Sequence, residues 1–305
     1  MAAISTLAMT LSSGDRVLIP DDVYGGTYRL FAKVLGQVGI EFATVDMTDL
    51  EAVERSLEEG AAMLLAETPT NPVLKVLDLE ALAERGHGAG ALVAVDNTFA
   101  TPFTQRPLEH GADVVVYSAT KYLGGHSDLV MGSLATSDEE LAERLRFLQN
   151  SIGAIPGPFD CWLLLRGLKT LAIRMRAHSA GTERVVEWLQ QQDVVTDIYF
   201  PGLPEAPNHD VAARQMSAAG EPLYGGMVSF EVDTPERALR ICESTRLFFL
   251  GESLGGVESL IEHPGRMTHA SLAGSGMEVP DTLIRLSVGI EHPEDLVNDL
   301  EQAFR

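Results

Sequence analysis

The chain has 305 residues, of which 45% are hydrophobic and 22% are charged, a composition typical of a folded protein with about two domains. Its formal net charge of -22 repels phosphate backbones, so we expect no nucleic-acid partner. No apolar run reaches the roughly 20 residues of a membrane helix, and residues 1–11 lack the basic start of a signal peptide. We therefore expect no membrane partner.

The cysteines and histidines show no metal-binding pattern. Cys161 and Cys242 lie far apart in the sequence, which predicts neither a disulfide nor a zinc site and fits a reducing cytoplasm. We expect both to be small buried hydrophobic residues. His126, His263 and His269 lack metal-ligand spacing with carboxylates or thiols, so we expect structural loop histidines and no metal.

The first half of the chain alternates apolar runs with helical patterns. Strands are predicted at 16–20, 42–45, 62–66, 91–95 and 113–117, and helices at 27–36, 50–57 and 79–87. Because the strand runs show no polar alternation and are separated by helices, they predict parallel strands covered on both faces. The fold class is therefore α/β, with a doubly wound, mostly parallel sheet.

The second half has a different pattern. A long helical periodicity from Phe159 to Gln192 includes Gly167, which predicts a long or broken helix. Strands are then predicted at 196–199, 227–232, 246–250 and 283–288, and helices before 227, at 235–244 and at 293–304. This pattern predicts a smaller C-terminal α/β domain, and we divide the chain into a large domain, 1–175, and a small domain, 176–305.

Polar residues follow three of the predicted strands, in segments 67–72, 95–98 and 118–122. Ligands of such sheets bind at the carboxyl ends of the strands. Alternate side chains of an extended segment face the same way, so Ser118 and Thr120 can point together at a phosphate, with a lysine beside them.

That lysine, Lys121, and the strand-end residue Asp96 suit one cofactor chemistry. Lysine forms a Schiff base with pyridoxal 5'-phosphate (PLP), and an acidic residue commonly pairs with the ring nitrogen. Each signal alone is weak, because a strand-end aspartate is more often a helix cap or a turn residue.

Short motifs along essentially the whole chain strengthen this interpretation. They are 22–28 (DVYGGTY), 67–72 (ETPTNP), 95–99 (VDNTF), 118–128 (SATKYLGGHSD), 166–170 (RGLKT), 252–259 (ESLGGVES), 267–271 (MTHAS) and 285–291 (RLSVGIE). In this order they resemble the PLP-dependent enzymes of Cys/Met metabolism, the family of cystathionine γ-synthase and γ-lyase. The resemblance implies PLP fold-type I, which is the fold of aspartate aminotransferase.

The resemblance also implies roles around the cofactor. Lys121 would bind PLP covalently and move protons, and Asp96 would pair with the ring nitrogen. Ser118 and Thr120 would bind the phosphate. Tyr24 would stack on the ring and act as an acid or base near the γ-substituent of the substrate.

Further residues would bind the amino-acid substrate. The resemblance implies that Arg285 clamps the substrate carboxylate, a geometry that suits guanidinium. Asn71 and Ser253 would lie near the cofactor O3′ or that carboxylate, and Glu252 would line the distal substrate pocket. Met1 would stand at a helix N-terminus, a kind of site that binds phosphate through free N–H groups.

The resemblance to the family begins at residues 1–3 (MAA), which match the end of a Gly-Met-Ala-Ala turn in the family. The glycine and the family segment before it are not in this sequence. In the family that segment carries a dimer-clasping arm, with a tyrosine and an arginine that reach the neighbouring phosphate, and the full-length protein is a homo-oligomer, a dimer of dimers. We expect a fragment or a late start, with weakened PLP binding and defective assembly.

The resemblance implies chemistry at Cγ of amino acids. Gly26 stands where methionine γ-lyases have a cysteine, and 156–160 and 273–280 look more like bacterial γ-synthases. We expect a cystathionine γ-synthase, which joins an O-acylhomoserine and cysteine. The alternatives are a cystathionine γ-lyase (giving cysteine, 2-oxobutyrate and ammonia), an O-acetylhomoserine sulfhydrylase, or an inactive fragment. A NAD-binding oxidoreductase is disfavoured, because no Gly-x-Gly-x-x-Gly follows an early strand.

Overall fold

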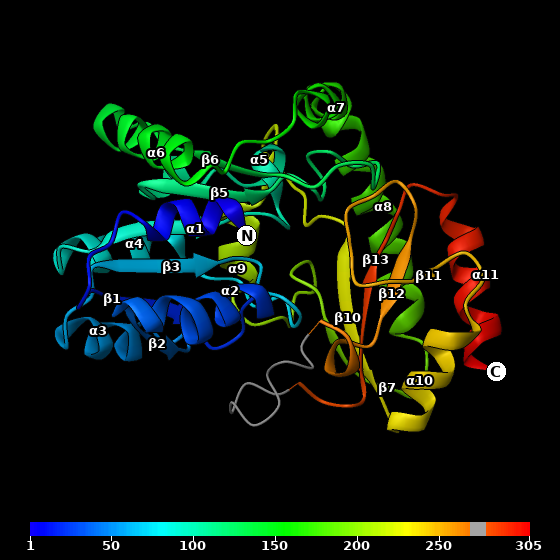
Figure 1. Cartoon of the computed structure of the whole chain (residues 1–305). Helices are drawn as coiled ribbons and strands as arrows, with labels where there is room; N and C mark the ends of the chain where they lie inside the picture. Colours follow the sequence, from blue (N-terminus) through cyan, green and yellow to red (C-terminus); the bar gives the residue numbers. More distant parts are fainter. Residues whose placement is uncertain (269–278) are drawn as a thin grey trace.

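The computed structural model describes residues 1–268 and 279–305 (Figure 1). The expectations for His269 and for 273–278 therefore lie outside the described residues. A large sheet from the N-terminal half and a smaller sheet from the C-terminal half stand side by side. In the described part of the chain, no helix has both the length and the apolar character needed to cross a membrane.

The larger sheet has six strands in the order β2-β1-β3-β4-β5-β6. Its strands are β1 (Arg16–Pro20), β2 (Glu41–Val45), β3 (Met63–Glu67), β4 (Leu92–Asp96), β5 (Val114–Ser118) and β6 (Gly132–Ala135). The first five are parallel, and β6 joins the edge antiparallel to β5. The predicted parallel sheet is thus confirmed, and β6 is an edge strand that the sequence pattern did not reveal.

Helices cover both faces of this sheet, as a doubly wound fold requires. Neighbouring residues of a strand point to opposite faces, so Val17 packs with α1 (Ala2–Ala8) and α6 (Glu139–Ile152). Leu18 packs on the other face with α3 (Leu50–Glu58) and α4 (Leu79–Gly88). Strands buried on both faces have no polar alternation, which explains their apolar sequence.

The predicted helix at 27–36 has a different form. It begins earlier, as α2 (Gly25–Arg29), and continues as a π-helical turn, η1 (Leu30–Val34), and a 3-10 turn, η2 (Leu35–Val38). Gly39 ends it with a φ of 85°, a left-handed conformation that favours glycine. The start and the regularity of the predicted helix were therefore wrong.

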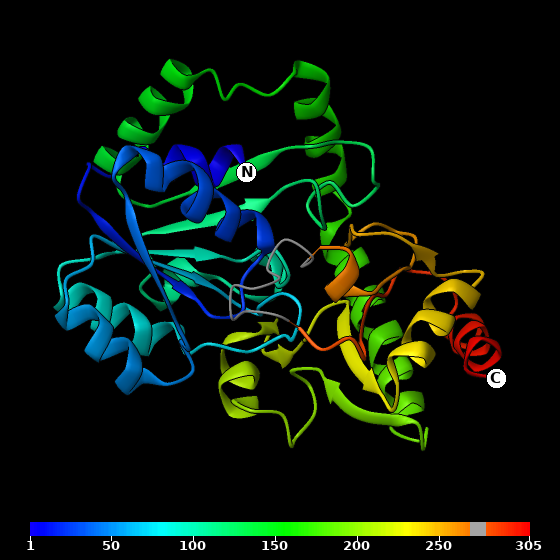
Figure 2. The same cartoon turned by 60° about the horizontal axis from the view of Figure 1, so that its bottom comes forward.

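The long helical pattern after residue 158 is broken in two, α7 (Pro158–Leu168) and α8 (Leu171–Leu189). Near the break a Cβ on Gly167 would lie 2.3 Å from the carbonyl oxygen of Gly124, so glycine permits this close backbone approach. Arg174 donates to the carbonyl oxygen of Gly167 at 2.9 Å. Helices α6 and α7, with the segment between them, arch over one side of the molecule (Figure 2).

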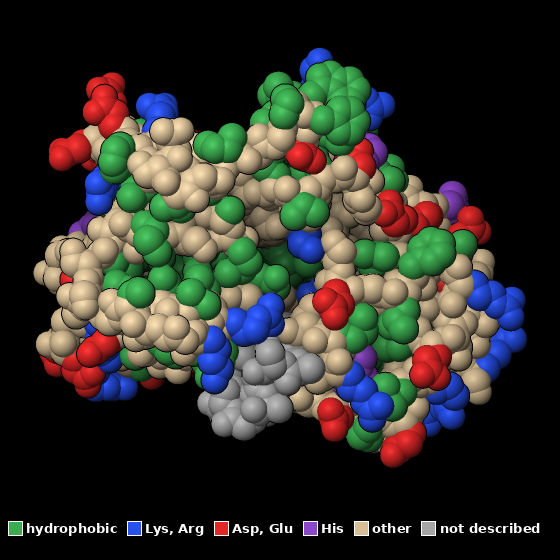
Figure 3. Space-filling model, in the orientation of Figure 1, with side chains coloured by type: hydrophobic (Ala, Val, Ile, Leu, Met, Phe, Trp, Pro, Cys, Tyr) green, Lys and Arg blue, Asp and Glu red, His purple; other side chains and the backbone are tan. Residues whose placement is uncertain are grey.

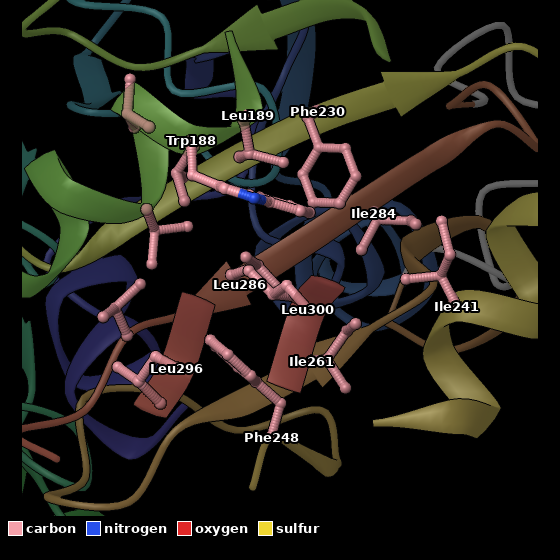
Figure 4. Packing of buried hydrophobic residues seen from close by; sticks show 14 of the residues in the cluster. Trp188, Leu189, Phe230, Ile241, Phe248, Ile261, Ile284, Leu286, Leu296 and Leu300 are labelled. Atoms are coloured by element: carbon pink, nitrogen blue, oxygen red, sulfur yellow. The ribbon is translucent and has the colours of Figure 1, made fainter. Parts of the chain in front are cut away.

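The smaller sheet has five strands in the order β11-β12-β13-β10-β7. They are β7 (Val195–Tyr199), β10 (Met227–Val232), β11 (Phe249–Leu250), β12 (Leu260–Glu262) and β13 (Leu283–Ser287). Helices α8, α10 (Pro235–Ser244) and α11 (Pro293–Phe304) enclose a core with Trp188, Phe230 and Leu300 (Figure 4). The predicted smaller α/β domain is present, and we propose the division at 175/176, which α8 crosses.

One predicted strand, 246–250, is shorter in the structure. The buried carboxylate of Asp299 accepts the backbone N–H groups of Arg246, Leu247 and Phe248 at 2.7 to 3.1 Å. These groups are therefore not available for strand pairing, and β11 begins only at Phe249.

The remaining elements are short: α5 (Thr101–Thr104), η3 (Pro107–His110), α9 (His209–Gln215), β8 (Ser217–Ala218), β9 (Glu221–Pro222) and η4 (Pro264–Arg266). Both cysteines are free. Cys242 is buried as expected, but Cys161 on α7 is only partly buried, so that expectation was wrong for Cys161.

Candidate active site

A cavity of about 370 Å³ opens where the larger sheet faces the smaller domain (Figure 3). The strand ends Glu67, Asp96 and Ser118 lie in its wall. The site residues proposed from the sequence also meet here: Met1, Tyr24, Asn71, Asp96, Ser118, Thr120, Lys121, Glu252 and Arg285 line the cavity. Ser253 contacts Lys121. The carboxyl ends of the parallel strands β3, β4 and β5 thus line one cavity, as is usual for ligand sites in such sheets.

Lys121 lies in the turn after β5, with its amine directed to the smaller domain. Its Nζ donates to Ser253 Oγ at 3.0 Å. Burial and the nearby Arg285 lower the pKa of Lys121 from 10.5 to about 8, against the opposing influence of Glu262 and Glu252. About a tenth of the amine is therefore neutral at pH 7, compared with fewer than one in a thousand for an ordinary lysine, and the neutral amine is the form that attacks a carbonyl.

This lowered pKa predicts how the protein without cofactor takes up PLP. Only the neutral amine forms the covalent link, so the attachment rate should rise about tenfold per pH unit and level off near pH 8. Stopped-flow absorbance after mixing the cofactor-free protein with PLP measures this rate. If the rate still rises tenfold between about pH 8.5 and 9.5, the pKa of Lys121 is that of an ordinary lysine and the prediction is wrong.

Asp96 ends β4, and its carboxyl plane is held by Thr98. Its Oδ1 accepts from Thr98 N at 3.0 Å and from Thr98 Oγ1 at 2.5 Å. Burial raises the pKa of Asp96, although the Thr98 hydrogen bonds oppose this. A protonated ring nitrogen beside it would stabilise the ionised form of this buried carboxylate.

Ser118 and Thr120, the residues predicted to bind the phosphate, make different hydrogen bonds in the structure. The backbone N–H of Ser118 donates to Thr98 Oγ1 at 2.8 Å, which ties the ends of β4 and β5 together. The Thr120 hydroxyl donates to Met131 O at 3.2 Å and accepts from Met131 N at 2.9 Å. It would have to leave Met131 O to donate to a phosphate, so its role stays a prediction, as does that of Met1.

Tyr24 stands in the cavity wall at the start of α2, with 37% of its surface exposed. A Cβ on Gly26 would lie 2.3 Å from Tyr24 Cε1. Glycine at position 26 therefore makes room for the Tyr24 ring, and a larger residue would displace it.

Arg285 is 2% exposed and is held by residues from several segments. Its Nη1 donates to Asn71 Oδ1 at 2.6 Å and lies 3.0 Å from Glu262 Oε1. Its Nη2 donates to Glu252 O at 3.0 Å. Among residues 1–268 and 279–305, its buried Nε has no hydrogen-bond partner, so one donor of the guanidinium is unused.

Sequence reasoning missed three functional candidates. Glu262 pairs with Arg285 across neighbouring strands. Glu67 accepts backbone hydrogen bonds from Tyr24 and Asn71 and so joins two loops of the site. The hydroxyl of Thr98 donates to the carboxylate of Asp96. A signal existed for Glu262: one glutamate follows the apolar pair 260–261, and a charge in a buried strand needs a partner. Of the described residues, no group of three or more His, Cys, Asp or Glu could hold a metal.

These residues fit PLP. A lysine amine of lowered pKa, a buried acid for the ring nitrogen and a buried arginine beside them make the chemistry of a PLP-dependent enzyme. The sequence pattern of the "Cys/Met metabolism PLP-dependent enzyme" family matches residues 1–305. The chain belongs to this family and adopts the PLP fold-type I.

Individual relatives carry different activities in their names. The cystathionine gamma-synthase of Mycobacterium tuberculosis is 53% identical over 299 residues, 98% of this chain and 76% of that protein. The cystathionine beta-lyase of Lactococcus lactis is 48% identical over 308 residues, 100% of this chain and 80% of that protein. The crystal structure of metB from Corynebacterium glutamicum superposes with a TM-score of 0.96 at 47% identity, covering 100% of this chain and 78% of that one.

Proposed function

We propose that the protein is a cystathionine γ-synthase, which joins an O-acylhomoserine and cysteine to give cystathionine and a carboxylic acid. The observation that carries this proposal is the cavity in which Lys121, Asp96 and Arg285 meet, in a chain 53% identical to a protein named cystathionine gamma-synthase. Gly26 supports it, because a side chain there would meet the ring of Tyr24, whereas methionine γ-lyases have a cysteine at that position.

Each cavity residue has a task that follows from its position. Arg285 lines the cavity, where its guanidinium binds the substrate carboxylate and thereby orients Cα. Bound PLP supplies an electron sink for negative charge at Cα. The neutral amine of Lys121 takes the Cα proton and can return it.

The distal end of the cavity would accommodate the reacting γ-carbon. A second proton leaves Cβ, and the Tyr24 hydroxyl gives a proton to the departing acyl oxygen. The cysteine thiol then adds its sulfur at Cγ and gives its proton to Tyr24, and a proton returns to Cβ and to Cα. Glu252 is exposed and lines the cavity, so it can contact the amino group of the incoming cysteine. The C–O bond that breaks is thus replaced by a C–S bond.

The test compares two reactions of the purified protein supplied with PLP. One sample receives O-succinylhomoserine and cysteine and is analysed for cystathionine by mass spectrometry. The other receives cystathionine alone and is analysed for 2-oxobutyrate. We expect the first reaction to be faster; faster release of 2-oxobutyrate would instead identify the alternative, a cystathionine γ-lyase.

We propose further that the protein acts in the cytoplasm as a homo-oligomer. Helix α7 exposes Phe159, Trp162 and Leu165 with 67, 56 and 63% of their surfaces accessible, a kind of apolar patch that often mediates association. Free Cys161 and Cys242 support a reducing compartment.

The oligomer is tested by analytical ultracentrifugation. We expect the native chain to sediment as a multimer, and Leu165→Glu to shift it towards the monomer because a charge would enter the apolar contact. Phe249→Glu is a matched control, because Phe249 is equally exposed (61%) but lies on β11 rather than α7. A native monomer, or an equal shift with both variants, would contradict the proposal.

A further inference from the structure

Glu67 connects two loops that carry separate parts of the site. It is the last residue of β3 and is 6% exposed. Its Oε2 accepts the backbone N–H of Tyr24 at 3.1 Å, and its Oε1 accepts the backbone N–H of Asn71 at 3.0 Å. In Figure 1 the C-terminal end of β3 and the start of α2 both face the smaller domain. One carboxylate thus holds two loops at a fixed separation.

The first loop depends on this contact. Tyr24 is the N-cap of α2 but makes no side-chain capping bond, and two glycines follow it. Glycines allow many backbone conformations, so the hydrogen bond to Glu67 restricts a segment that is otherwise adaptable. The position of the Tyr24 ring in the cavity follows from the position of its backbone.

The second loop transmits the contact to the smaller domain. Asn71 accepts from Arg285 Nη1 at 2.6 Å, and its own N–H is the one that Glu67 binds. A displacement of Asn71 would therefore turn the guanidinium of Arg285, since a buried guanidinium follows its hydrogen-bond partners.

A carboxylate is an electrostatically unfavourable choice at this position. Burial raises the pKa of Glu67 well above its usual value, and the neighbouring Asp96 and Asp22 add to this effect. An amide or apolar side chain would avoid that cost, but neither offers two acceptor oxygens to two N–H groups at once. The geometry explains why a buried acid occupies this position.

We propose that Glu67 is a positioning residue, which sets the places of Tyr24 and Asn71 and, through Asn71, the orientation of Arg285. This inference rests on the proposed function only in assigning Arg285 to the substrate carboxylate. Although Glu67 lies in the cavity wall, both of its carboxylate oxygens accept backbone N–H groups of the loops, so we assign it to holding those loops and not to binding substrate. Its effect should appear in amino-acid binding and in the environment of the cofactor.

The test uses Glu67→Gln in the protein loaded with PLP. Glutamine keeps the size but offers one acceptor, so one N–H loses its partner. The probe is L-norvaline, an amino acid without a γ-leaving group, titrated by the absorbance change of the cofactor. We expect its dissociation constant to rise roughly tenfold and the visible circular dichroism of bound PLP to change as Tyr24 moves.

Asp299→Asn is the matched control, because Asp299 is also buried and also holds backbone N–H groups, but in the smaller domain away from the cavity. It should lower the melting temperature without altering norvaline binding or circular dichroism. If Glu67→Gln behaves like Asp299→Asn, the inference is overturned. If Glu67→Gln does not fold, Glu67→Asp takes its place, since the shorter carboxylate reaches only one N–H. A native protein that binds PLP but does not respond to norvaline would contradict the proposed function instead.

Discussion

Replacing Lys121 by alanine is expected to abolish turnover. Lys121 is the lysine among the described residues that line the cavity, and its amine donates to Ser253. We propose that this amine links to PLP and moves the Cα proton. General acid–base catalysis alone accounts for about 10²- to 10⁴-fold in rate, so we expect a loss of at least about a thousandfold. Activity assays and the visible absorbance that survives desalting both measure the effect.

Lys75→Ala is the matched control for this prediction. Lys75 is partly buried but pairs with Asp21 and Asp46 outside the cavity. We expect its substitution to leave the absorbance band intact, whereas Lys121→Ala removes it. A band that persists in the Lys121 variant would place the link elsewhere.

Replacing Arg285 by methionine is expected to affect both stability and substrate binding. Arg285 and Glu262 are 2% and 0% exposed and lie opposite each other on β13 and β12. Removing one partner of a buried ion pair leaves an uncompensated charge and costs about 3–5 kcal/mol. Urea unfolding measures this loss, and titration of the PLP-loaded variant with L-norvaline should show no saturation.

A double variant separates the two effects. Arg285→Met combined with Glu262→Leu leaves no buried charge, so much of the stability should return while norvaline binding stays lost. Recovery of norvaline binding in the double variant would show that Arg285 does not bind the substrate carboxylate.

The stability of the Arg285→Met variant should also depend on pH. Burial already raises the pKa of Glu262, and Arg285 opposes this rise, so removing Arg285 raises that pKa further. The folded state then holds a proton that the unfolded state has released, and the stability of Arg285→Met falls as the pH rises above the usual range of a glutamate. A stability deficit that is the same at all pH values would contradict this mechanism.

The parallel strands and the place of the site could be predicted from local patterns. Strand ends that carry Asp96 and Ser118 follow apolar runs, and parallel strands end at one edge of a sheet. The family motifs added Tyr24 and Arg285, which lie more than 250 residues apart and meet in one cavity. The apolar strand pattern and the family motifs can both be read from the sequence, because each of them involves only a few neighbouring residues.

The bounds of β11 and the irregular turns after α2 could not be predicted from local sequence patterns. The shortened β11 depends on Asp299, about 50 residues further along the chain, and the irregular turns after α2 depend on packing against the sheet. Long-range hydrogen bonds of this kind leave no periodic pattern, since neither partner reveals the other in the sequence.

The sequence by itself determined the α/β class, the order of most elements and the set of residues that meet in the cavity, because hydrophobic periodicity and short motifs are local properties. Only the tertiary structure decided how these residues are held. The bonds from Glu67 to two loops, the burial of Glu262 against Arg285 and the lowered pKa of Lys121 arise from groups brought together by folding. The desolvation that shifts a pKa and the pairing of buried charges arise only when folding packs these groups together out of water.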